Sequence, residues 1–232
     1  MAGQEVGTSI EASVRHRSKA RRRAAILDST LTLLRTAPID TVSIEAIAAA
    51  AGVAPATVYN LIGPRDRLLL ACVDEVLESL VDDLVQHPVH DDPVAAAQHI
   101  IERSCAAFID DGDAFRQVVT AVNGLSRAGA SLSMDPSQLQ VTVMRAAHEL
   151  GMLHEAADPV AIGRQVFLSF NGALFAWAAR QLSDDGFRAA ALHGLWTVLA
   201  AFGASGWRDE FLELAQESAA RMVAAGYGRP TG

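Results

Sequence analysis

Three Asp-Pro pairs divide the C-terminal two thirds of the sequence into helical segments. Aspartate caps the first turn of a helix and proline fits its first position, so Asp92-Pro93, Asp135-Pro136 and Asp158-Pro159 each predict a helix start. Between these starts apolar residues recur at spacings of three and four, and the alternating runs typical of β-strands are nearly absent. The sequence therefore predicts an all-α fold.

The same reasoning along the whole chain predicts about ten helices joined by short connections. Pro88 ends the fourth of them, because proline lacks the amide hydrogen that a continuing helix needs. No repeat of fixed period is visible in the sequence. The expected helices cover residues 18–36, 43–51, 55–61, 64–86, 93–110, 113–127, 136–151, 159–182, 187–202 and 207–225.

The composition is that of a globular protein with one or two domains, at roughly 150 residues per domain. Its two cysteines, Cys72 and Cys105, lie in apolar helical patterns, so we expect buried, reduced thiols and neither a disulfide framework nor a cysteine-based zinc finger. No segment reads as a membrane span, and the N-terminus lacks the apolar region of a secretory signal. These features predict a cytoplasmic protein without a membrane partner.

The charge is divided unevenly along the chain. Residues 1–70 carry nine Lys or Arg against six Asp or Glu, a balance of +3, and residues 71–232 carry ten against twenty-one, a balance of −11. A basic head on an acidic body is typical of a nucleic-acid-binding protein in which only the head contacts phosphate. Basic termini are also common as solvated tails, so the charge alone leaves both interpretations open.

Residues 42–61 combine a short helix, a glycine turn and a second short helix. Ala48 has to be small because the second helix crosses over it, and Gly52 lets the backbone take a positive φ at the turn. Any two short helices can meet at a glycine, but basic residues precede this pair, which favours a DNA-binding helix-turn-helix whose second helix enters the major groove. The small core that fixes the crossing angle is expected from Ile44, Ile47, Val53 and Val58.

A family resemblance is carried by Ile26-Leu27, Thr41-Val42-Ser43-Ile44, Ile47-Ala48, Ala51-Gly52-Val53, Thr57-Val58-Tyr59, Arg65 and Leu68-Leu69. Through them, residues 20–71 resemble the DNA-binding region of the tetracycline-repressor-like (TetR) family of bacterial transcription regulators. The resemblance implies a three-helix head on a larger helical body. Ala54 departs from the family pattern, in which a capping Ser or Thr is usual, and Leu61-Ile62 and Pro64-Arg65 replace the common His-Phe and Ser-Lys pairs. We therefore do not infer the operator sequence of this protein from that of a relative.

The expected DNA contacts are of several kinds. By resemblance to the family, the hydroxyls of Thr57 and Tyr59 donate to phosphate, and Arg65 supplies positive charge. Asn60 either reads adenine through two hydrogen bonds or is solvated, and Arg17 either reaches the DNA or belongs to a solubilising arm. Base reading is then sparse, which favours recognition through DNA shape. The full expected set is Arg17, Ser43, Pro55, Ala56, Thr57, Tyr59, Asn60 and Arg65.

Residues 71–232 contain no catalytic constellation: no Gly-x-Ser-x-Gly elbow, no glycine-rich phosphate loop and no His-Glu-x-x-His motif. We therefore expect no enzyme activity and no cofactor. One group of His and Asp residues has metal-binding side chains, but most of it falls in a loop between helices, where polar residues are simply solvated, so we expect no metal site. That group is His87, His90, Asp91, Asp92 and His99.

The helices expected at 159–182 and 187–202 are apolar on all sides, and such helices have to be covered on all sides. A two-fold pair of chains covers them through a four-helix interface, which agrees with how the family dimerises. Small residues on one face of each helix allow close approach. The expected dimer residues are Gln165, Ser169, Gly172, Ala173, Ala176, Ala190, Gly194, Thr197 and Ala201.

The resemblance also implies an effector cavity enclosed by the fourth to eighth helices. A mostly apolar wall with Asn171 and His148 as polar groups suits a medium-sized hydrophobic molecule. The expected lining residues are Phe108, Phe115, Met144, His148, Phe167 and Asn171.

The leading hypothesis is a ligand-responsive transcription regulator, expected to be a repressor that binds a pseudo-palindromic double-stranded operator as a homodimer. One alternative is a constitutive or architectural DNA-binding protein without an effector. A more remote alternative is an all-helical enzyme or small-molecule binder. The expected domains are a flexible basic arm at 1–17, a helix-turn-helix domain at 18–64 and a ligand-binding and dimerisation domain at 65–232.

Overall fold

The computed structural model describes residues 2–86, 92–127 and 131–226, with the backbone alone at 2–16, 126 and 127. Within these residues the chain forms ten α-helices and no strand, which confirms the all-α prediction. Leu153 and Gly203 form an isolated antiparallel bridge. The helices are α1 (Ala2–Leu34), α2 (Ile44–Ala50), α3 (Pro55–Leu61), α4 (Arg65–Gln86), α5 (Pro93–Asp110), α6 (Gly112–Arg127), α7 (Ser137–Glu149), α8 (Pro159–Ala178), α9 (Asp184–Phe202) and α10 (Arg208–Ala224), with a 3-10 turn, η1 (Ile39–Thr41), after α1.

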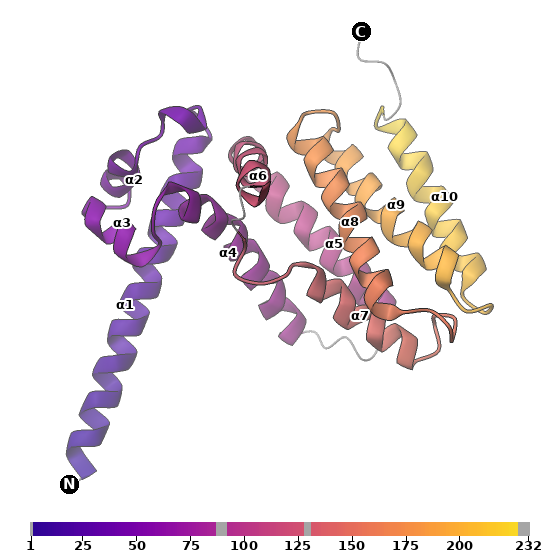
Figure 1. Ribbon diagram of the computed structural model, residues 1–232, viewed down its shortest axis with the longest axis horizontal. Coiled ribbons are helices and arrows are strands. Elements are labelled where there is room, and N and C mark those ends of the chain that lie inside the picture. The colour runs from indigo at the N-terminus through magenta and orange to yellow at the C-terminus, as the bar shows by residue number, and fades with distance from the viewer. Residues whose placement is uncertain (1, 87–91, 128–130, 227–232) are drawn as a thin grey trace.

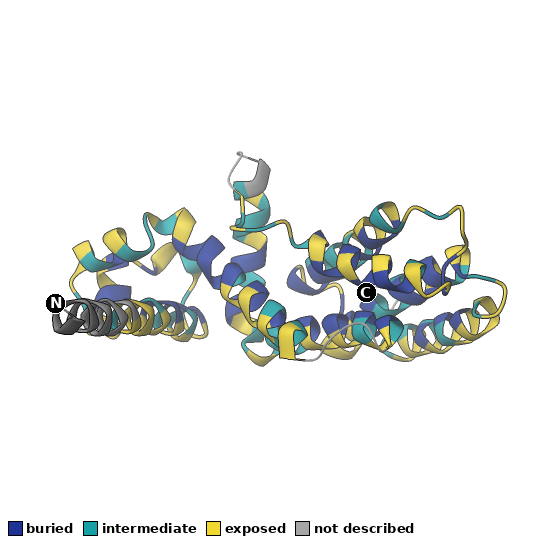
Figure 2. Ribbon diagram, turned by 90° about the horizontal axis from the view of Figure 1, so that it is seen from below, coloured by how far each residue is buried: buried dark blue, intermediate teal, exposed yellow. Residues whose placement is uncertain are grey.

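The helices are arranged as a head and a body (Figure 1). The head consists of α1, α2 and α3, and α4 leads from it into a body in which α5 to α10 pack against one another. The N-terminal part of α1 projects away from the rest of the head. Buried side chains form one hydrophobic cluster from Ile26 in α1 to Ala215 in α10, so head and body share a core (Figure 2).

The N-terminal helix is longer than the sequence predicts. The expected first helix starts at residue 18, whereas α1 begins at Ala2 and so includes most of the segment for which a flexible arm is predicted. The domain boundaries at 17 and 64 remain predictions. The short turn η1 between α1 and α2 is not predicted either, because its three residues carry no periodic signal.

The end of α8 also differs from the prediction. The helix stops at Ala178 rather than near residue 182, because Arg180 takes the left-handed conformation with φ 59°. The amide of Gln181 then donates to the carbonyl of Ala176 at 2.9 Å, which closes the helix. Glycine usually occupies such a position. Without a glycine here, the sequence carries no sign of the helix end.

Arg116, in α6, joins α6 to α8 and α9. Its guanidinium lies 4.1 Å from the centre of the Trp177 ring and donates to the Trp177 carbonyl and, at 2.9 Å, to Asp184 Oδ1. The Trp177 indole N–H donates to the same carboxylate oxygen at 2.7 Å. Desolvation by the surrounding protein lowers the pKa of Arg116. The guanidinium is thus held between an aromatic face and a carboxylate that connects two further helices.

The next residue of α6, Gln117, joins the body to the head. Its Nε2 donates to the carbonyls of Leu34 at 2.7 Å and Ala37 at 3.2 Å, and its Oε1 accepts from the amide of Ile39 at 2.7 Å. Leu34 is the last residue of α1, where carbonyls lack partners within the helix, Ala37 lies in the turn that follows, and Ile39 begins η1. A single side chain therefore pairs with the last carbonyl of α1, a carbonyl of the following turn and the first amide of η1.

Two glycines allow the helices of the body to approach closely. A Cβ atom at Gly163 would lie 2.6 Å from the backbone of Val141, so α7 and α8 are in backbone contact. A Cβ atom at Gly194 would lie 2.6 Å from Cβ of Ser169, which joins α8 and α9 in the same way. Large side chains fill the space beside these contacts, and Trp177 stacks on Phe187 at 5.3 Å.

Both cysteines are buried and free, as predicted. Burial raises the pKa of Cys72 and of Cys105 to about 12. Each side chain therefore stays a neutral thiol at physiological pH and serves as a small apolar group in the core.

Among the described residues no single helix is long and apolar enough to cross a membrane. The bent pair formed by α2 and α3 meets that test of length and composition when the two helices are taken together.

The contact at Gly163 predicts a large effect of one methyl group. Gly163→Ala should lower the free energy of unfolding by about 1–3 kcal/mol, because the new Cβ has to push α7 away from α8. Gly124 lies exposed in α6 with nothing within 4 Å of an added Cβ, so Gly124→Ala should raise stability by about 0.5–1 kcal/mol. Urea unfolding of both variants measures the difference, and equal stability of the two would contradict the close contact.

Candidate DNA-binding surface and effector cavity

The helix-turn-helix has the geometry that its sequence predicts. The axes of α2 and α3 are bent by 98° relative to one another, within the range of this motif. Gly52 has φ 65°, and the amide of Val53 donates to the carbonyl of Ala48 at 2.9 Å. Ala48 and Val58 are fully buried where the two helices cross. The turn thus depends on a glycine and on a small residue beneath the second helix.

The start of α2 carries a capped N-terminus. Ser43 has extended backbone angles, and its hydroxyl oxygen accepts from the amide of Ala46 at 3.1 Å. The hydroxyl hydrogen remains available to donate to a phosphate, as the predicted role of Ser43 requires. By contrast α3 has no side-chain cap at Ala54, and Pro55 occupies its first turn. The departure noted in the sequence therefore leaves the amides at the start of α3 without a side-chain partner.

The outward face of α3 is exposed. Pro55, Ala56 and Asn60 are exposed, and Tyr59 keeps 51% of its surface accessible although it is aromatic. Thr57 is half-buried. An exposed tyrosine beside small side chains on a protruding helix is a surface that can approach a DNA groove and donate to its phosphates.

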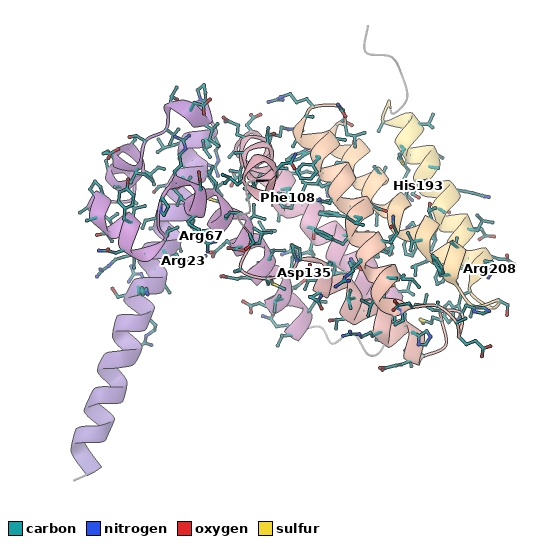
Figure 3. The ribbon with its side chains drawn as sticks, in the orientation of Figure 1. Arg23, Arg67, Phe108, Asp135, His193 and Arg208 are labelled. Carbon is teal, nitrogen blue, oxygen red and sulfur yellow. The ribbon has the colours of Figure 1, made fainter. Side chains whose placement is uncertain are left out.

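Several arginines of the head and of the start of α4 form hydrogen bonds or ion pairs within the protein. Arg65, predicted to contact phosphate, is half-buried and donates to the carbonyls of Ile39 and, at 3.2 Å, of Val42. Arg23 forms an ion pair with Glu75 at 2.6 Å, which fixes α1 to α4 (Figure 3). Arg17 is exposed. The guanidinium of Arg65 thus fastens the loop before α2, and a phosphate contact remains a prediction for it.

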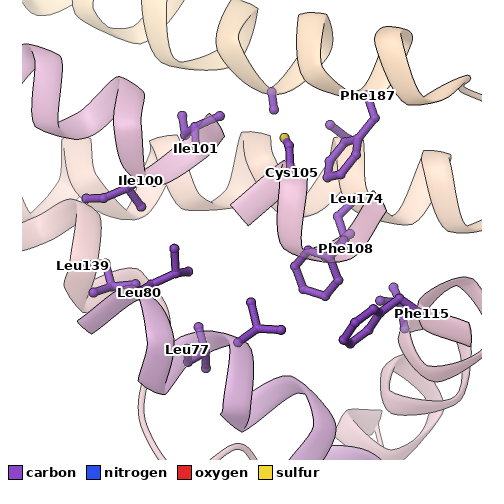
Figure 4. Packing of buried hydrophobic residues seen from close by; sticks show 14 of the residues in the cluster. Leu77, Leu80, Ile100, Ile101, Cys105, Phe108, Phe115, Leu139, Leu174 and Phe187 are labelled. Atoms are coloured by element: carbon purple, nitrogen blue, oxygen red, sulfur yellow. The ribbon is translucent and has the colours of Figure 1, made fainter. Parts of the chain in front are cut away.

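A cavity of about 570 Å³ lies in the body. It is bounded by α4, α5, α6, α7 and α8 and by the segment 131–136, so it occupies the place that the resemblance implies. Of the six residues expected to bind the effector, Phe108, Phe167 and Asn171 line this cavity, and their contact with a ligand stays a prediction. The rest of the wall is mostly apolar, with Leu77 and Leu80 contributed by α4 (Figure 4).

Three residues expected on the cavity wall lie elsewhere. Phe115 stands behind Phe108, edge to face at 5.1 Å, and Met144 is fully buried in the core. His148 is half-buried near the end of α7 and contacts the carbonyl of Glu155 at 3.3 Å. Periodicity places these side chains on the inner faces of their helices, but it does not separate the wall of a cavity from the packed layer behind it.

Polar wall residues that the sequence analysis did not select include Gln140, Ser104 and Asn123. Ser104 donates to the carbonyl of Ile100 at 2.6 Å, one turn earlier in α5. Gln140 is 4% exposed and lies between apolar neighbours in α7. A glutamine at a core position of an apolar helix is the signal that would have revealed it.

The segment 131–136 is tied to α4. Asp74, which is 3% exposed, accepts through Oδ1 from the amide of Ser133 at 2.8 Å and from its hydroxyl at 2.9 Å. Arg67 donates to the carbonyl of Ser131 at 3.1 Å. Because this segment forms part of the cavity wall, a molecule in the cavity would bear on α4 both directly and through these bonds.

Residues 26–72 match the family described as bacterial regulatory proteins, tetR family. The head therefore carries the DNA-binding domain of this family and is followed by a helical body, in agreement with the resemblance seen in the sequence. The match supports a DNA-binding regulator. No curated protein matches the chain.

Solved structures share the fold. SmeT, the repressor of the Stenotrophomonas maltophilia multidrug efflux pump SmeDEF, is 22% identical over 79% of this chain and 91% of its own, with a TM-score of 0.59. A TetR transcription regulator from Haloarcula marismortui has 17% identity, 80% and 100% coverage and a TM-score of 0.62. Thermus thermophilus FadR, a TetR family repressor in complex with lauroyl-CoA, has 18% identity, 77% and 93% coverage and a TM-score of 0.57.

The structure divides the residues expected at a dimer interface into buried and exposed ones. Gly194 and Ser169 meet each other between α8 and α9, and Ala173 is 7% exposed, so these three serve packing within the chain. Ala176 and Ala190 are half-buried. The exposed members of the set are Gln165, Gly172, Thr197 and Ala201.

The possible metal cluster is only partly described. His87, His90 and Asp91 lie outside the described residues. Asp92 caps α5 by accepting from the amide of Ala95 at 2.9 Å, and His99 contacts Asp83 at 2.6 Å. Within the described ranges no group of three or more His, Cys, Asp or Glu side chains is arranged to hold a metal ion.

Because Arg65 and Arg17 have different surroundings, their substitutions should have different effects on stability and on DNA binding. Arg65→Gln should lower the free energy of unfolding by about 1.5–3 kcal/mol, because two backbone carbonyls lose a charged donor. Arg17→Gln should change the free energy of unfolding by no more than about 0.5 kcal/mol. It should reduce the slope of the logarithm of DNA affinity against the logarithm of salt concentration by about one unit. Denaturant unfolding and DNA titrations at several salt concentrations measure both. An Arg65→Gln protein with unchanged stability and a reduced salt slope would assign Arg65 to phosphate.

Proposed function

We propose that this regulator is a homodimeric repressor, acting in the cytoplasm, that a small and mostly apolar effector releases from a pseudo-palindromic operator. One observation carries the proposal. Helices α4 and α6 both line the cavity, and both are also bonded to α1 of the head. SmeT is a repressor and Thermus thermophilus FadR is in complex with lauroyl-CoA, which supports a repressor with an apolar effector on this fold.

The connection through α4 is direct. Its first residue, Arg65, is bonded to the loop before α2, and Glu75 is paired with Arg23 of α1. Val76, Leu77 and Leu80 of the same helix face the cavity. A ligand that prefers one tilt of α4 therefore changes the position of the head, and a fixed operator cannot follow both heads of a dimer.

The connection through α6 runs in parallel. Val119 and Val122 line the cavity, and Gln117 on the same helix holds the end of α1. With α6 included, the head is held at two points, so that a shift of either helix turns the head rather than merely loosening it.

Dimerisation is proposed through the exposed faces of α8 and α9. Gln165 and Gly172 lie exposed on α8, together with Leu168, whose exposed fraction is 58%. Gly172 has nothing within 4 Å of an added Cβ, so another helix can approach it closely. α10 already covers one side of α9, where Trp196 stacks on Phe211 at 6.4 Å. The need for a partner chain therefore rests mainly on the exposed face of α8.

The operator experiment tests the function itself. The protein should be a dimer by light scattering at micromolar concentration, and it should protect a two-fold symmetric site with half-site centres about 34–36 Å apart, in DNA upstream of its own gene. Gly172→Leu should weaken both dimerisation and operator binding without harming the monomer, because the position is open. Gln216→Leu, which adds a leucine to the exposed face of α10, is the matched control. A stable wild-type monomer, or a Gly172→Leu dimer as tight as wild type, would contradict the proposed interface.

The α6 connection predicts a separable effect on induction. An effector found by a thermal-stability screen should lower operator affinity about 5- to 150-fold in the wild type, and operator should lower effector affinity by the same factor. Gln117→Ala should reduce this factor while leaving effector binding to free protein unchanged. Thr120→Ala is the control, because its hydroxyl bonds only to the Arg116 carbonyl of its own helix. A tight effector that leaves operator affinity unchanged in the wild type would show two uncoupled sites.

A further inference from the structure

The amide of Gln140 is the least satisfied polar group of the cavity wall. The residue is 4% exposed, and its Oε1 is buried without a hydrogen-bond partner among the described residues. Its Nε2 makes only a long contact of 3.4 Å to the carbonyl of Ala97 in α5. A buried amide oxygen without a donor is costly, because folding removes its water and gives nothing in return.

The position of Gln140 allows a ligand to supply that donor. Gln140 lines the cavity, between α5 and α7. The terminal torsion of a glutamine side chain is soft, so the amide can turn toward a donor that enters the cavity. Asn123 and Asn171 also line the cavity, but both are half-buried and remain accessible to water. Gln140 is therefore the wall group that gains most from a bound donor.

The charge of the wall argues against an anionic ligand. None of the described residues that line the cavity is Lys, Arg or His. The ionisable group on the wall is Asp135, whose carboxylate accepts from the hydroxyl of Ser137 at 2.7 Å and from its amide at 3.0 Å. The hydrogen bond from the Ser137 side chain lowers the pKa of Asp135, so the carboxylate stays charged at neutral pH. Arg164 lies close enough to act on Asp135 but does not line the cavity, so a carboxylate or phosphate ligand would find no positive side chain on the described wall.

We propose that the effector is an uncharged, largely apolar molecule with one hydroxyl group, and that Gln140 accepts the hydrogen bond of that hydroxyl. This inference rests on the proposed function only in taking the cavity as the effector site. It goes further in naming the chemical class of the effector and the residue that selects it. The hydroxyl satisfies the free amide oxygen, and the apolar part replaces empty space beside Phe108, Leu80 and Phe167.

The test compares three probes that share one chain: 1-decanol, decyl methyl ether and decanoate at pH 7.5. Wild-type protein should bind decanol roughly 3- to 10-fold more tightly than the ether, the gain expected for one neutral hydrogen bond, and should bind decanoate most weakly. In Gln140→Leu the affinities for decanol and ether should become equal. Gln216→Leu, the same substitution on the exposed face of α10, is the matched control and should keep the wild-type ratio, because Gln216 does not line the cavity.

A second measurement separates a binding role of Gln140 from a structural one. Without ligand, Gln140→Leu should melt at the same temperature as wild type or higher, because an apolar side chain of similar size replaces a half-satisfied amide. A large loss of stability would assign Gln140 to the core and overturn the inference. Equal wild-type affinities for decanol and ether, tighter decanoate, binding of none of the three probes, or a lost ratio in Gln216→Leu would overturn it as well. The operator titration requires no effector and decides the proposed function separately.

Discussion

The structure depends on the way α6 joins the head to the body. Two consecutive residues of this helix point to different partners: Gln117 holds the end of α1 through Leu34, Ala37 and Ile39, and Arg116 is clasped by Trp177 and Asp184 of the body. Hydrogen bonds to otherwise unpaired helix-end groups are worth most where water is excluded. The end of α1 is therefore attached to the body at one defined place, and without it the orientation of the head would rest on α4 and on the ion pair of Arg35 with Asp111.

The cavity lies between the two connections, which is the placement that the proposed regulation by an effector requires. Empty volume in a protein core is destabilising, since the lining atoms lose contacts that a packed core would supply. Here the volume is bounded by α4, by α6 and by a segment that Asp74 ties to α4 through Ser133. In the proposed mechanism a ligand that fills the volume recovers those contacts, and the helices that adjust to it are the ones that carry the head. The contacts that stabilise the bound state are then the same contacts that move the head.

The sequence predicts the parts of this structure that depend on local rules. The caps at Asp92 and Asp158 and the glycine turn at Gly52 fix helix starts and the helix-turn-helix. The helix end at Arg180 is not predicted, because an arginine in a left-handed conformation has no signature in composition. The sequence also does not separate Phe108, which borders the cavity, from Phe115, which does not. Both lie on inner helix faces, and only the relative placement of several helices decides which of them borders the cavity.

The charges of the head show why a count of basic residues overstates what is available to DNA. Arg23 is paired with Glu75, Arg67 donates to Ser131, and Arg65 donates to Val42 and Ile39, so all three position α4 against its neighbours. Charge toward phosphate then falls to the exposed cations of α1 and to the amides and hydroxyls at the starts of the two short helices. Amides and hydroxyls are strongly directional donors. The proposed operator binding would therefore depend more on the orientation of the head, which α4 and α6 hold, than on its net charge.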